Sequence, residues 1–231
     1  MKVGIMQPYF MPYYGYWQLI KFVDKYVVYD DVNFIKGGWI NRNFILMNGT
    51  KHLFTIPLES SSPNKRINDT FITSKTLVRE KLIKTLFQSY SKAKNFRLVF
   101  PILQSSIMNS RTISELNYNL ICHFSSYLKF DTQIVLSSNL IKDNSLKGQD
   151  KVIHIVQSLA GSHYINAIGG KELYSKDDFF KEGIVLNFLK SNDIHYKQFN
   201  NEYIPNLSFI DLLMFNDVEV INAMLDNFEL I

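Results

Sequence analysis

The sequence predicts an α/β fold in which a mainly parallel sheet is flanked by helices and carries an inserted helical subdomain. Short apolar strands alternate with helical segments in the outer thirds of the chain. Residues from about 75 to 129 show only the spacing of apolar residues that is typical of helices. With 231 residues, 46% of them hydrophobic, the chain can bury one substantial core. We therefore expect a single domain over residues 1–231, with a helical insertion at about 75–129.

The beginning of the chain predicts half of an α/β nucleotide-binding unit. An apolar strand at 3–6 leads into Gln7, a turn rich in tyrosine and proline, and a helical segment. A second strand at 26–29 ends on Asp30 and Asp31. Because ligands sit at the carboxyl ends of parallel strands, we expect Gln7, Asp30 and Asp31 to lie side by side at one edge of the sheet. Neither glycine fingerprint of dinucleotide or Walker-type phosphate binding occurs here.

Residues 32–43 combine paired glycines with long polar side chains. Gly37 and Gly38 permit tight backbone conformations, and loops of this kind often carry function. The segment predicts an anion-binding cluster, in which an arginine can grip a phosphate or carboxylate through two hydrogen bonds. A solvated hairpin rim is the alternative interpretation, and the nearby carboxylates favour a site. The polar members of the cluster are Lys36, Asn41, Arg42 and Asn43.

The middle of the chain predicts a hairpin followed by helices. Residues 44–58 form the expected hairpin, because Asn48-Gly49 is the preferred chemistry of a tight turn. A short strand is expected at 67–72. Ser74 has the character of a helix N-cap, and the apolar spacing after it predicts helices as far as Leu128.

The last third predicts strands at 132–136, 163–166 and 184–189, with a helix at 151–159. The first of these strands ends on Ser137 and Ser138, which repeats the small polar groups expected at a ligand-binding edge.

Two further features of this region carry candidate residues. Gly169 and Gly170 precede a predicted helix at 172–180, whose free backbone N–H groups would suit an anion, although a plain tight turn is the simpler interpretation. A final helix is expected to start at Asn206 or Ser208, with Asp211 in its first turn, where the helix dipole favours a carboxylate.

The composition narrows the class of protein. One cysteine, Cys122, excludes an intramolecular disulfide and makes a cytoplasmic location the expectation. No apolar stretch reaches the ~18 residues of a spanning helix. The net charge of +4 is a weak bias toward anionic ligands, which phosphorylated small molecules satisfy as well as nucleic acid does.

The residues limit the chemistry as well. No G-x-S-x-G motif for a serine hydrolase occurs. Acid–base chemistry by Asp30, Asp31 or His163 remains, with Lys36 and Arg42 as charge stabilisers. No dedicated zinc site is predicted, because no i, i+4 pair occurs among the histidines His52, His123, His154, His163 and His195. Asp30 and Asp31 could still hold magnesium together with a phosphate.

A composite signature runs through the chain. It consists of residues 6–16, 29–36 and 39–43, then Ser137-Ser138, 164–166 with Gly169-Gly170 and 173–174, and finally 207–213. In this combination the sequence resembles the WbqC-like family of bacterial proteins over nearly the whole chain. Two positions depart from the family pattern. Met6 stands where many members carry histidine, and Gly37 stands where many carry a basic residue.

The resemblance implies a role in bacterial surface-glycan biosynthesis, such as that of O-antigen lipopolysaccharide. The implied reaction adds an aminoacyl group such as glycine, or another acyl group, to the amine of a nucleotide-linked 4-amino-4,6-dideoxysugar. Asp31 would be the general base that deprotonates the sugar ammonium, and Arg42 would stabilise the anionic group of the donor. Asp30 and His163 are the other catalytic candidates. The substrate-binding candidates, with Tyr9 and Tyr16 stacking on the ligand, are Gln7, Tyr9, Tyr16, Asn33, Lys36, Trp39, Asn41, Ser137, Ser138, Gly169, Gly170 and Asp211.

Two alternatives come from other classes of function. One is a non-catalytic sugar-nucleotide binding protein, and the other is a magnesium-dependent nucleotidyltransferase. The expected partners are a nucleotide-linked amino sugar and a small-molecule acyl donor, with no nucleic acid and no membrane span. The sequence identifies neither the donor nor a cofactor, and it leaves a homodimer open.

Overall fold

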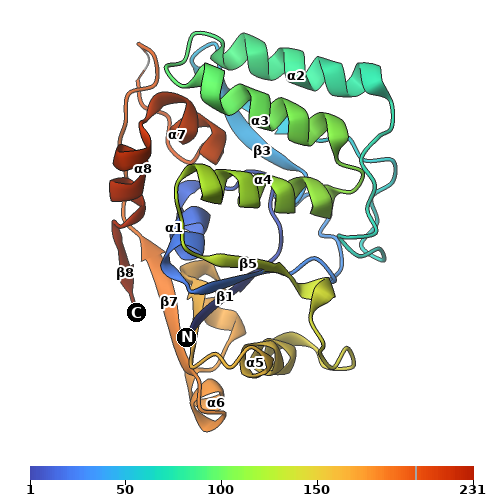
Figure 1. Ribbon diagram of the computed structural model, residues 1–231, viewed down its shortest axis with the longest axis vertical. Helices are drawn as coiled ribbons and strands as arrows, with labels where there is room; N and C mark the ends of the chain where they lie inside the picture. The colour runs from blue at the N-terminus through green and yellow to red at the C-terminus, as the bar shows by residue number, and fades with distance from the viewer. Residues whose placement is uncertain (201) are drawn as a thin grey trace.

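The computed structural model describes residues 1–200 and 202–231 (Figure 1). Its main feature is a six-stranded sheet in the order β5-β2-β1-β6-β7-β8. All neighbouring pairs are parallel except β7 and β8, which are antiparallel. This confirms the predicted fold class. The strands are β1 (Lys2–Met6), β2 (Lys25–Val28), β5 (Gln133–Leu136), β6 (His163–Ala167), β7 (Val185–Ser191) and β8 (Phe228–Leu230).

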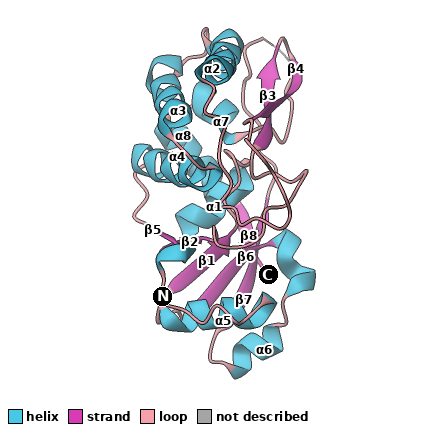
Figure 2. Ribbon diagram, turned by 90° about the vertical axis from the view of Figure 1, so that its right-hand side faces the viewer, coloured by secondary structure: helices cyan, strands magenta, loops and turns pink. Residues whose placement is uncertain are grey.

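Helices cover both faces of this sheet (Figure 2). One face packs against α5 (Gly148–Ser158) and α6 (Lys176–Lys181), and the other packs against α1 (Tyr14–Phe22). The alternation along β1 explains this division, because Val3 and Ile5 belong to the core beneath α5 while Gly4 lies against α1. A Cβ at Gly4 would lie 3.4 Å from the side chain of Leu19 on α1, so glycine lets α1 approach closely.

The strand order defines a switch point between β1 and β6. From β1 the chain first builds β2 and β5 on one side, and it then crosses back to build β6 and β7 on the other. In open α/β sheets the crevice outside the carboxyl ends of the strands at such a point is where ligands bind. The loops after β1 and β6 therefore position the candidate site.

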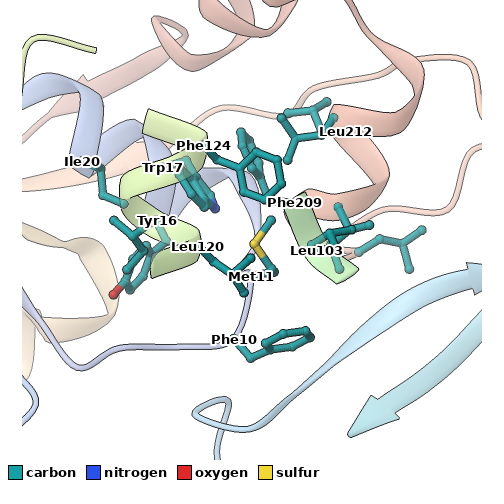
Figure 3. Packing of buried hydrophobic residues seen from close by; sticks show 14 of the residues in the cluster. Phe10, Met11, Tyr16, Trp17, Ile20, Leu103, Leu120, Phe124, Phe209 and Leu212 are labelled. Atoms are coloured by element: carbon teal, nitrogen blue, oxygen red, sulfur yellow. The ribbon is translucent and has the colours of Figure 1, made fainter. Parts of the chain in front are cut away.

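The predicted insertion consists of α2 (Thr76–Tyr90), α3 (Phe96–Asn109) and α4 (Ile113–Tyr127), which stack above α1 (Figure 1). The predicted hairpin is also confirmed, as β3 (Arg42–Met47) and β4 (Thr50–Thr55). The insertion shares its core with the sheet layer (Figure 3). The ring of Trp17 on α1 stacks at 4.4 Å on Phe209 and meets Phe124 of α4 edge-on at 6.5 Å.

Three sequence predictions about local structure are wrong. Residues 67–72 form isolated bridges and turns instead of a strand, because Asn68 and Asp69 interrupt the alternation. Helix α2 begins after Lys75, which makes no side-chain cap, so Ser74 is not the N-cap. The helix expected at 172–180 is a 3₁₀ helix (Ile168–Leu173) followed by the short α6, which Ser175 caps.

The C-terminus contains more structure than the sequence predicted. Ser208 caps α7 (Phe209–Phe215), as expected. Helix α8 (Val218–Leu225) and the antiparallel edge strand β8 follow it and were not predicted. None of the helices in the described part of the chain combines the length and the apolar character needed to span a bilayer.

Candidate functional site

An aromatic pocket of about 270 Å³ opens at the switch point. Met6 and Ala167, the last residues of β1 and β6, form its floor at the sheet edge. No charged residue lines it among the residues that the structure describes. We call this cavity the aromatic pocket; its lining is Met6, Tyr9, Pro12, Tyr13, Tyr16, Trp39, Asn43, Ala167 and Asn206.

The wall formed by residues 7–13 is held through its backbone carbonyls. The hydroxyl of Tyr16 donates to the carbonyl of Gln7 at 2.8 Å. Asn117 on α4 donates to the carbonyl of Pro8 at 2.9 Å, and Asn43 on β3 donates to that of Met11 at 2.7 Å. Met11 has a φ of 41°, in the left-handed region that only such external contacts maintain in a residue of this type. The wall is therefore preorganised by donors from three different elements.

The opposite wall is carried by Trp39. Its carbonyl accepts from the backbone N–H of Phe10 at 2.9 Å, and its ring lies 5.9 Å from that of Phe44. The side chain stays 44% exposed, so one side of the indole is free to meet a ligand. Next to it, Asn41 donates to the carbonyl of Ile56 at 2.9 Å and so fixes the loop instead of facing the pocket.

Replacing Asn43 by alanine should loosen this wall. The change removes donors to Phe10 and Met11 and the acceptor of the Phe44 N–H, all of which are largely buried. At about 1 kcal/mol for each lost bond, we expect unfolding to become easier by about 2–4 kcal/mol. Urea denaturation measures this loss. Asn64→Ala is the matched control, because Asn64 is an exposed residue of a surface loop, and a loss as large there would contradict the assignment.

The two carboxylates after β2 lie beside the residues that follow β5. Asp30 is buried and accepts from both the backbone N–H of Ser138, at 2.9 Å, and its hydroxyl, at 2.7 Å. The parallel pairing of β2 with β5 brings these residues together, because both strands end at the same edge of the sheet. Gln7, after the neighbouring β1, presents a buried side-chain oxygen with no partner among the described residues.

Asp31 belongs to a buried ion pair. Its carboxylate lies 2.9 Å from the ammonium of Lys142 and 3.8 Å from that of Lys151, and Lys142 also donates to the carbonyl of Ser137. Burial alone would raise the pKa of Asp31, but the contact with Lys142, the nearby hydroxyl of Ser137 and the two positive charges hold that pKa below its ordinary value. This works against the predicted role of Asp31 as general base, because a lowered pKa makes the carboxylate a poorer proton acceptor.

Several other candidates lie away from the pocket or are engaged within the fold. His163 starts β6, at the amino end of the sheet beside Ser162, so it stands at the opposite edge from Asp31. Arg42 donates to the carbonyls of Gly37 and Gly38, which makes it a brace of its own loop. Lys36 and Asn33 are exposed, and Asn33 forms an isolated bridge with Arg66.

The paired glycines do not stand at the start of an α-helix, which corrects that expectation. Gly169 and Gly170 lie inside the 3₁₀ helix that follows Ala167, a lining residue of the aromatic pocket. Gly170 is buried, and a Cβ there would stand 2.5 Å from the side-chain amide of Asn166. A close packing requirement therefore explains this glycine.

Asp211 is fully buried in a network of side chains from the chain itself. Its carboxylate accepts from the hydroxyls of Tyr90 at 3.0 Å and Tyr196 at 2.8 Å and from the amide of Gln198 at 2.7 Å. Burial is the dominant effect and raises the pKa of Asp211 to about 6, although the three hydrogen bonds oppose the rise. Because Asp211 does not line the aromatic pocket, its role here is to anchor the segment that contains Tyr196 and Gln198.

Sequence reasoning missed several residues that form the site. Asn117 lies within an apolar helix, and a buried amide at such a position signals an external backbone partner. Asn206, at a φ of 57°, was expected only as a possible helix cap, and Tyr13, although it belongs to the tyrosine-rich turn, was not among the candidate site residues.

Comparison with known proteins supports a relationship over almost the full chain. Residues 7–223 match the model of a family described as the WbqC-like protein family. A protein of Mycobacterium tuberculosis (strain H37Rv), described as uncharacterized protein Rv1507c, is 25% identical over 217 residues, which cover 92% of each chain. No solved structure shows significant similarity to this chain.

Proposed function

Because the chain belongs to the WbqC-like protein family, we propose that it is a transferase of bacterial surface-glycan biosynthesis. The reaction that we propose adds an aminoacyl group of the glycyl type, or another acyl group, to the amine of a nucleotide-linked amino-dideoxysugar. In the step that joins them, the amine nitrogen bonds to the acyl carbon, the bond from that carbon to the donor's leaving group breaks, and the amine proton passes to the departing group.

The single observation that carries this proposal is the aromatic pocket at the switch point of the sheet. Its rings suit the faces of a base or a sugar, since stacking on aromatic side chains is worth about 1–3 kcal/mol per base. The ring of Tyr9 lies 5.8 Å from that of Tyr16 at a tilt of 37°, so the buried Tyr16 supports Tyr9 from behind. The volume, about 270 Å³, is near the lower end of typical ligand pockets, ~300 Å³, and suits one ring system at a time.

In this proposal the charged residues orient the ligand and hold the surrounding loops, and none of them is assigned a proton-transfer role. Lys142 and Lys151 lie beside Asp31 at the same edge of the sheet, where they favour an anionic group such as a phosphate of the nucleotide. Gln7 offers its unpartnered oxygen to a hydroxyl of the ligand. Arg42 keeps the loop before β3 in shape, and Trp39 on that loop supplies the stacking surface.

One observation favours the non-catalytic alternative. A pocket with no charged lining residue among those described can hold a sugar nucleotide without transferring anything to it. The nucleotidyltransferase receives less support, because Ser138 and Lys142 already engage the carboxylates of Asp30 and Asp31 that would be needed to hold magnesium.

A ligand screen with product analysis tests the proposal. Thermal shift against dTDP- and UDP-linked amino sugars, ATP and acyl donors should show stabilisation by an amino sugar nucleotide, and mass spectrometry should then detect the acylated sugar. Trp39→Ala should weaken binding of that sugar nucleotide by about tenfold or more, since it removes one stacking face. Phe180→Ala on α6 is the control, because Phe180 is 75% exposed and far from the pocket lining.

The outcomes separate the three functions. Binding followed by a mass gain supports the transferase. Binding with no modified product from any donor supports the binding protein, and turnover of nucleoside triphosphate with magnesium supports nucleotidyl transfer. Equal affinity of the Trp39→Ala variant and the unmodified protein would remove the aromatic pocket as the ligand site.

A further inference from the structure

A second hollow of about 380 Å³ adjoins the aromatic pocket. The two cavities share Asn206, and consecutive residues line them, with Tyr13, the N-cap of α1, in the aromatic pocket and Tyr14, the first residue of α1, in the second hollow. We call this cavity the Asp193 hollow; its lining is Tyr14, Asp193, Ile194, His195, Tyr203, Pro205 and Asn206.

The lining combines aromatic rings with one carboxylate. The ring of His195 lies 4.7 Å from that of Tyr203, and Tyr14 is fixed because its hydroxyl donates to the carbonyl of Asn192 at 2.9 Å. Asp193 is the only charged carboxylate in the lining, and neither lysine nor arginine contributes to it among residues 1–200 and 202–231. Aromatic faces and a carboxylate without a competing cation attract a positively charged group.

The electrostatics of the two tyrosines agree with this. Burial is the main reason that the pKa of Tyr203 rises to about 12, followed by Tyr14 and the charge of Asp211, with Asp193 contributing least. Burial and then the charge of Asp193 likewise raise the pKa of Tyr14. Because the lining contains the carboxylate of Asp193 and neither lysine nor arginine, an ammonium group would fit the hollow better than a phosphate.

The far side of the hollow is built on a fixed segment. Tyr196 and Gln198 are held by Asp211, and the amide oxygen of Gln198 accepts from the backbone N–H of Ile204 at 2.8 Å. These contacts join the two ends of the segment that contributes His195 and Tyr203. The hollow thus has a preformed geometry, which lowers the cost of binding.

We propose that the Asp193 hollow is an ammonium subsite that receives the amine of the amino sugar while the aromatic pocket holds the ring of that sugar. This inference rests on the proposed function and deepens it, since it assigns the group that distinguishes an amino sugar from its hydroxyl counterpart. Asp193 forms the ion pair, and Tyr14 and Tyr203 provide the ring faces.

Calorimetric titration of two sugar nucleotides tests the subsite. One is dTDP-4-amino-4,6-dideoxyglucose, and the other is dTDP-6-deoxyglucose, which carries a hydroxyl in place of the amine. We expect the protein to prefer the amine by about tenfold. Asp193→Asn should reduce that preference to within about twofold and leave the affinity for the hydroxyl compound unchanged. Asp177→Asn, an exposed aspartate on α6, should keep the full preference. An undiminished preference in Asp193→Asn overturns the proposal.

A second measurement keeps the subsite testable if neither sugar nucleotide binds. Titration with n-propylammonium should shift the aromatic NMR signals of Tyr14, His195 and Tyr203, and n-propanol should not. Shifts that disappear in Asp193→Asn would support the subsite even though the proposed function had failed. Absence of any shift with n-propylammonium, or equal shifts with both compounds, would overturn the subsite whether or not the sugar nucleotides bind.

Discussion

Replacing Asp211 by leucine should lower the free energy of unfolding by about 3–6 kcal/mol, a large part of the ~5–15 kcal/mol that holds a typical domain together. The change leaves the hydroxyls of Tyr90 and Tyr196 and the amide of Gln198 without their shared acceptor. Each buried donor without a partner costs about 1–3 kcal/mol. Urea denaturation followed by circular dichroism measures the loss. A loss below about 1 kcal/mol would mean that the network contributes little.

Asp211→Asn is the matched control and also reveals a pH dependence. Asparagine keeps an oxygen for Tyr196 and Gln198, so it should cost much less than leucine. The pKa of Asp211 is about 6 in the native state against an ordinary 3.8, so the native state binds this proton more tightly than the unfolded state does. The contribution of Asp211 to stability is therefore greatest below about pH 4 and falls by about 3 kcal/mol as the pH rises past 6. The difference in unfolding free energy between the unmodified protein and Asp211→Asn should therefore decrease as the pH rises from 4 to above 6.

Replacing Lys142 by methionine should have an effect of similar size. The side chains of Lys142 and Asp31 are only 2% and 5% exposed. Removal of the Lys142 ammonium leaves the carboxylate of Asp31 with only the more distant ammonium of Lys151, at 3.8 Å, and breaking a buried pair costs about 3–5 kcal/mol. We expect that loss at pH 7 in urea denaturation. Because protonation then neutralises Asp31, the loss of unfolding free energy caused by Lys142→Met should shrink as the pH falls toward 4.

A double variant separates the pair from its surroundings. Asp31→Asn combined with Lys142→Met removes both charges at once, so it should recover much of the stability that Lys142→Met alone loses. If the double variant is as unstable as the sum of the two single changes, the two residues do not act as a pair in solution.

The sequence predicted the elements that are determined by neighbouring residues, and it missed those that form only through contacts between distant parts of the chain. The strands were visible because runs such as Tyr26-Val27-Val28 are β-branched or aromatic and end in polar turns. The edge strand β8 was not, because three residues, of which Glu229 is charged, carry no strand pattern of their own. It forms because it pairs with β7, a contact that no local rule indicates.

The candidate site divides in the same way. Asp30 and Ser138 could be expected to meet, because each follows a parallel strand and the carboxyl ends share one edge. Nothing in the sequence tied Lys142 to Asp31, since that contact depends on how the loop before α5 folds back. For the same reason Asp31 was assigned a proton-accepting role that its two lysine neighbours oppose.

The hydrogen bonds that hold residues 7–13 make the aromatic pocket depend on the helical insertion. Helix α4 lines none of the aromatic pocket, yet the amide of Asn117 holds the carbonyls of Pro8 and Ile40, one on each side of the opening. Deleting the helical insertion would free both carbonyls and remove Phe124 from its contact with Trp17. The insertion therefore fixes the shape of the pocket opening without lining the pocket, and the pocket cannot be separated from the rest of the fold.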